Sequence, residues 1–68
     1  MSERIRTIRD QLELLAAELT DESISILRDA VDRGETRRPE ADKKVLQARR
    51  SVEKAIRSLE MVDSGRSE

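Results

Sequence analysis

Several residue types that small proteins use for stability or chemistry are missing from this 68-residue chain. It has no cysteine and no histidine, which excludes disulfide bonds, a structural zinc site and the usual thiol nucleophiles and imidazole bases. Without such reinforcement, a chain this short supports only a marginal hydrophobic core. We therefore expect extra buried surface to come from a second chain.

Aromatic residues are absent too, since the chain contains no Phe, Tyr or Trp. Many single-stranded nucleic-acid binders stack bases on aromatic rings, and many protein interfaces are anchored by them. This chain has neither device. A core of Leu, Ile, Val and Ala is instead typical of packed helices.

Long apolar runs are also missing. The longest run, Leu14 to Ala17, is far too short for a membrane span or a signal peptide. Charged residues make up 43% of the chain, but 14 basic and 15 acidic groups nearly cancel. These features predict a cytoplasmic protein that has no membrane partner and no strong long-range attraction to anionic polymers.

The chain does contain a seven-residue apolar repeat in its second half. The members of this repeat are spaced four and three residues apart: Ala41, Val45, Ala48, Val52, Ala55, Leu59 and Val62. A similar stripe with mostly larger side chains lies upstream: Ile5, Ile8, Leu12, Leu15, Leu19, Ile26 and Ala30. Such spacing predicts two helices packed along each other, with large residues facing small ones.

Glycine and proline mark a single internal break between the two predicted helices. Gly34 is placed to end the first helix after Arg33, and Pro39 suits the first turn of the second. The predicted helices span about residues 3–33, with Ser2 as the N-cap, and about residues 38–62. Residues 1–62 are expected to form a single helical domain, and residues 63–68 a disordered C-terminal tail.

An antiparallel hairpin aligns the two stripes if Arg33 lies opposite Pro39. The Ala positions then form a close-approach contact inside the seam. The expected pairs in this register are Val31 with Ala41, Leu27 with Val45, Ile24 with Ala48, Leu19 with Val52, Ala16 with Ile56, and Leu12 with Leu59.

One local pattern indicates an alternative fold, a three-helix bundle with a break near Thr20. Thr20 followed by Asp21 and Glu22, with Leu19 and Ile24 on either side, is typical of a helix start with a hydrophobic staple. The hairpin is favoured because the apolar stripe stays in phase across this point and no Gly or Pro interrupts it.

The apolar surface is wider than a two-helix seam requires. Ile24, Val31 and Leu46 fall beside the seam rather than on it. We expect a second interface here that pairs two hairpins into a dimeric four-helix bundle. The residues predicted at this interface are Ile24, Leu27, Val31, Val45 and Leu46.

No motif for catalysis, cofactor binding or metal binding stands out. Glu18 and Glu22 lie four residues apart on one helix face, but a carboxylate pair lacks the oxygen cage that calcium requires. We therefore predict no enzyme activity, no cofactor and no metal site.

Basic residues recur on the second predicted helix, on the face opposite the Ala and Val stripe. Such a stripe can follow a phosphate backbone, although neighbouring acidic residues weaken its potential. Six residues are candidate nucleic-acid contacts: Arg37, Arg38, Lys43, Arg50, Lys54 and Arg57.

These patterns predict a small non-enzymatic protein–protein interaction module, such as an adaptor, regulator or accessory subunit. The chain is expected to act as a homodimeric helical hairpin and to bind another protein. The alternative hypothesis is a nucleic-acid-binding regulator that uses the basic stripe on the second helix.

Overall fold

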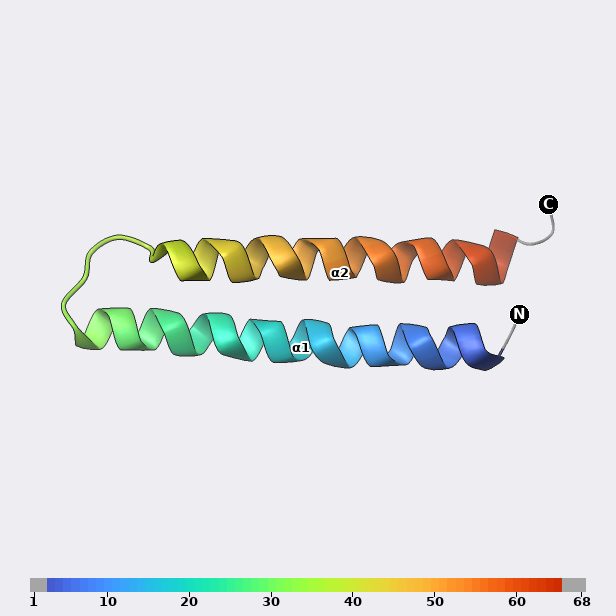
Figure 1. Ribbon diagram of the computed structural model, residues 1–68, viewed down its shortest axis with the longest axis horizontal. Coiled ribbons are helices and arrows are strands. Elements are labelled where there is room, and N and C mark those ends of the chain that lie inside the picture. Colours follow the sequence, from blue (N-terminus) through green and yellow to red (C-terminus); the bar gives the residue numbers. More distant parts are fainter. Residues whose placement is uncertain (1–2, 66–68) are drawn as a thin grey trace.

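The computed structural model describes residues 3–65 as two helices packed side by side in an antiparallel hairpin (Figure 1). Helix α1 spans Glu3–Asp32 and helix α2 spans Glu40–Gly65. Helix α1 is continuous through Thr20, whose hydroxyl donates to the carbonyl of Ala16 at 3.2 Å instead of capping a new helix. The predicted hairpin is confirmed, and the three-helix alternative is wrong.

Helix α1 ends at a glycine, as predicted. Gly34 has a φ of 80°, in the left-handed region that glycine adopts without strain. Its N–H donates to the carbonyl of Val31 at 2.9 Å, and the N–H of Glu35 donates to the carbonyl of Ala30 at 3.0 Å. These two bonds form a Schellman motif with Gly34 at the C′ position.

Helix α2 begins directly after Pro39. The Pro39 carbonyl accepts from the N–H groups of Asp42 at 3.1 Å and Lys43 at 3.3 Å, while its missing N–H is not needed there. The helix starts two residues later than predicted and ends at Gly65, three residues beyond Val62. The predicted N-cap Ser2 and the tail residues 66–68 lie outside the described residues.

The hairpin is a single layer of helices. Its principal extents are 53 × 17 × 11 Å, and the smallest of them is about the diameter of one helix. Among the residues that the structure describes, Ala30 is the one buried apolar side chain, at 3% exposure. Two helices alone therefore enclose no sizeable core.

Only part of the predicted seam is buried between the two helices. Ala30 is buried, and eight other members of the two stripes are half-buried: Ile5, Leu12, Leu19, Ile26, Val45, Val52, Ala55 and Leu59. The remaining five members are exposed: Ile8, Leu15, Ala41, Ala48 and Val62. The seam is completed by buried or half-buried residues that the stripes left out: Arg9, Ala16, Ser23, Asp42, Arg49 and Ile56.

The predicted register is wrong. A hydrogen bond from Ser23 to Asp42 places these residues level with each other, whereas the prediction set Ser23 near Arg49. The difference is about seven residues, or roughly 10 Å along the helix. It arises because the connection between the helices is not a tight turn: it runs back beside the end of α1, which projects past the start of α2 (Figure 1).

Neither helix, over the residues described, is both long and apolar enough to cross a membrane.

Candidate interaction surfaces

A small polar cluster lies inside the seam near the loop. The Ser23 hydroxyl donates to Oδ1 of Asp42, a side chain with 0% exposure. The other oxygen, Oδ2, lies 2.9 Å from Nη1 of Arg38, close enough for an ion pair but without the alignment of a hydrogen bond. The cluster joins α1, the loop and α2 at one point and thereby sets the register of the hairpin.

This cluster is the part of the structure that the sequence pattern missed. By its spacing, Asp42 is one of the acidic residues that flank the basic stripe, and charged residues are mostly exposed to solvent. Its partner Ser23 lies 19 residues away in the sequence. No local spacing rule connects the two residues, so no sequence signal could have found the pair.

One flank of the seam is an apolar surface. Ile8 and Leu15 stand four residues before the seam residues Leu12 and Leu19, and Ala48 stands four before Val52. Positions with the same offset from the seam project from the same side of two antiparallel helices. We call this surface the apolar face, and its exposed members are Ile8, Leu15, Ala41, Ala48 and Val62.

The five residues predicted at a second interface do not share one exposed surface. Ile24 and Val31 are exposed, Leu27 and Leu46 are half-buried, and Val45 belongs to the seam. Ile24 lies nine residues after Leu15, which is half a turn around the helix at 100° per residue. Ile24 and Val31 therefore lie away from the apolar face, and the predicted contact of the five residues with a second copy stays a prediction.

A hollow on the other flank is lined by Leu46, Arg49, Arg50 and Glu53. Nε of Arg49 donates to Oε2 of Glu53 at 3.0 Å, one helical turn further along α2. This pair leaves Arg50, which forms no ion pair with another described residue, as the one unpaired charge that lines the hollow. The hollow therefore presents a single positive charge to a ligand rather than a cluster of charges.

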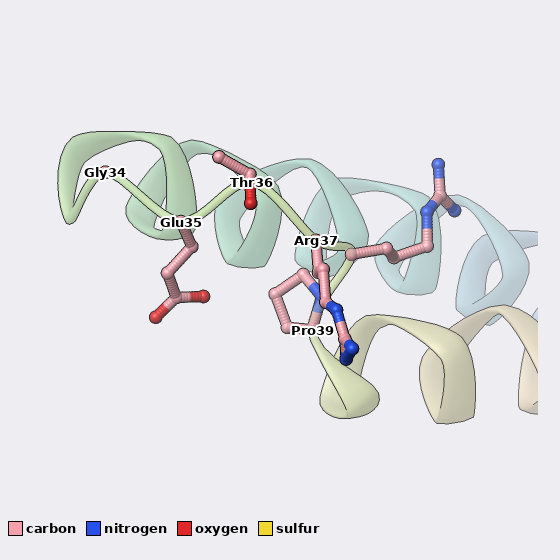
Figure 2. Close-up of a pocket in the computed structure, with 6 residues that line it drawn as sticks. Gly34, Glu35, Thr36, Arg37 and Pro39 are labelled. Atoms are coloured by element: carbon pink, nitrogen blue, oxygen red, sulfur yellow. The ribbon is translucent and has the colours of Figure 1, made fainter.

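A second hollow is formed by the loop from Gly34 to Pro39 (Figure 2). Of its two arginines, Arg38 is engaged with Asp42. Beside it, Nε of Arg33 donates to Oε2 of Glu35 at 2.9 Å, and this hydrogen bond raises the pKa of Arg33 above its ordinary value. The local charges are thus largely paired with one another.

The basic stripe is exposed along most of its length. Lys43, Arg50, Lys54 and Arg57 are exposed on α2, and Arg37 is exposed in the loop. Arg38, the sixth predicted contact, instead pairs with the buried Asp42. Over residues 3–62, whose side chains the structure describes, no group of three or more acidic, His or Cys side chains is arranged to hold a metal ion.

Comparison with known proteins finds no match: no family model, no curated protein and no solved structure matches this chain.

Proposed function

We propose that this chain is a non-enzymatic interaction module of the cytoplasm that associates with itself and serves as an adaptor, regulator or accessory subunit for another protein. One observation carries the proposal: in the described part of the chain, the only buried apolar side chain is Ala30. Domains are generally built from at least two packed layers around a core. A second layer from another chain supplies what this hairpin lacks.

The exposed apolar side chains support the same conclusion. Seven large ones are between 40% and 70% exposed: Ile8, Leu14, Leu15, Ile24, Val31, Met61 and Val62. Burying one such side chain completely contributes about 1.5–3 kcal/mol, so covering only some of them contributes several kcal/mol. That is comparable with the whole stability of a small domain.

The mass of the chain in solution tests this proposal. Sedimentation equilibrium of the full chain at about 100 µM should give twice the 7.8 kDa monomer mass, with helix content that falls on dilution. A folded monomer at that concentration would overturn self-association.

The exposed basic stripe supports a second candidate, nucleic-acid binding. Lys43, Arg50, Lys54 and Arg57 form no ion pair with any residue in the described range. Binding through them should be micromolar at about 50 mM salt and should weaken steeply as salt rises. Absence of binding to both RNA and DNA at that salt concentration would end this alternative.

A further inference from the structure

We infer that the apolar face binds a second copy of this chain, with α1 of each copy packed on α2 of the other. This inference rests on the proposed self-association and assigns the surface and the arrangement that produce it. Three independent observations lead to the second copy: the side-chain sizes on the apolar face, the dimensions of the hairpin and the charges of its two halves.

Side-chain size is complementary between the two halves of the apolar face. Helix α1 contributes the large side chains Ile8 and Leu15, and α2 contributes the small Ala41 and Ala48, with the larger Val62 near its C-terminal end. When α1 lies on α2 of a second copy, large residues meet small ones and the helices can approach closely. Pairing like helices would instead crowd large side chains together on one side of the bundle and leave small ones facing each other on the other.

The area of the face suits a dimer. The broad side of the hairpin measures 53 by 17 Å. A footprint of this size is comparable with the roughly 800 Å² that each partner buries in a standard specific interface. A second copy laid along this side can therefore form an interface of ordinary size.

Charge favours the crossed pairing of α1 with α2. Residues 1–33 carry five basic and eight acidic groups, a net charge of −3, while residues 34–68 carry nine basic and seven acidic groups, a net charge of +2. Pairing α1 with α2 brings opposite charges together, whereas pairing α1 with α1 opposes like charges. Glu22 then lies level with Lys44 of the second copy, because Ser23 is level with Asp42 within each hairpin.

Three matched glutamate substitutions test the surface. Leu15→Glu places a charge on the apolar face, while Leu14→Glu and Ile24→Glu place the same charge elsewhere on α1. The three positions are comparably accessible, at 48%, 63% and 47% exposure. Sedimentation equilibrium should show that Leu15→Glu raises the dimer dissociation constant at least about 100-fold, because two charges are buried per dimer, while the other two change it less than about threefold.

The outcomes separate this inference from the proposed function. If the parent chain is dimeric and Ile24→Glu dissociates it while Leu15→Glu does not, self-association stands and the assigned surface is wrong. If the parent chain is monomeric, the proposed function itself fails.

A mixing experiment tests the crossed arrangement. Leu15 and Ala48 lie at nearly the same level on the apolar face, so Leu15 of one copy meets Ala48 of the other. Chains carrying Leu15→Glu and chains carrying Ala48→Lys should each be monomeric alone and should form a heterodimer when mixed, because the glutamate then meets the lysine. Recovery also shows that both chains fold. A mixture that stays monomeric would overturn the crossed arrangement.

Discussion

The two ends of the hairpin are built differently. The loop end, residues 20–45, contains every buried side chain in the described part of the molecule: Ser23, Ala30 and Asp42. The open end, residues 3–19 and 46–62, contains no buried side chain and carries most of the large exposed apolar side chains. The loop end is held by specific polar contacts and a capped helix terminus, whereas the open end has exposed apolar surface that the described part of the chain does not cover.

This difference assigns two tasks to two regions. The loop end determines how the two helices of one chain align, because Ser23 meets Asp42 in only one register. The open end contributes apolar surface for packing but no specific polar contact that sets the register. Its stability therefore depends on what packs against that surface. Four predictions test this division, from the largest expected effect to the smallest.

The largest effect is expected from Asp42→Ala. The change leaves the buried Ser23 hydroxyl without its acceptor, deprives Arg38 of its partner and opens a small void. An unsatisfied buried polar group costs about 1–3 kcal/mol, and we expect a loss of about 2 kcal/mol in the free energy of unfolding. Urea denaturation followed by circular dichroism measures it.

The double variant Ser23→Ala with Asp42→Leu is the matched control. It removes donor and acceptor together and fills the space with an apolar side chain, a replacement that is often neutral or stabilising. Its unfolding free energy should be close to that of the parent chain. A loss as large as that of Asp42→Ala would show that the carboxylate stabilises the fold by more than its contacts with Ser23 and Arg38.

The sequence alone predicted much of the architecture, for identifiable physical reasons. Glycine adopts the left-handed backbone conformation of Gly34 more readily than any other residue. The apolar repeats also extend far enough along the sequence to define both helices. The seam was misplaced by one column because Ala41 and Ala48 look like better core residues than Asp42 and Arg49. Leaving the methyl group of an alanine exposed costs little free energy, however. Ile56 lies in the same seven-residue column as Asp42 and Arg49, and burying part of its larger side chain in the seam stabilises the hairpin more.

The register was beyond sequence reasoning because the path of the loop determines it. The residues between Gly34 and Pro39 can form either a tight turn or a loop that runs back beside the end of α1. The two differ only in the direction that the backbone takes after Gly34. The predicted second interface stays a prediction. Val45, which the repeat already places in the seam, is half-buried there, and Ile24 and Val31 are exposed.

The next prediction concerns amide hydrogen exchange at the two ends. If the open end depends on a second copy, raising the chain concentration from about 10 µM to about 1 mM should slow exchange there at least tenfold. Amides near Leu12 and Val52 should respond, while those near Leu27 should change less. Equal slowing at both ends would show that the hairpin opens as one unit and that the two ends do not differ in stability.

A smaller loss is expected from Gly34→Ala. A Cβ at this position meets nothing within 4 Å, so the cost comes only from holding alanine at a φ of 80°. Part of that cost is offset because alanine also restricts the unfolded chain, and we expect a net loss of about 1 kcal/mol. Gly34→Asn should lose less, since asparagine tolerates the left-handed region better. Equal losses for the two variants would show that the backbone conformation is not what glycine provides.

The smallest effect is expected one residue further on, from Glu35→Gln. The ion pair of Glu35 with Arg33 is exposed to solvent on both sides, and such pairs contribute little. The contribution of Glu35 to the Schellman motif uses its backbone N–H, which the substitution leaves in place. The urea midpoint should therefore be unchanged within error, at low and at high salt. A loss as large as that of Gly34→Ala would mean that surface charge, rather than backbone geometry and the buried cluster, holds the loop end together, and the contrast between the two ends would lose its physical basis.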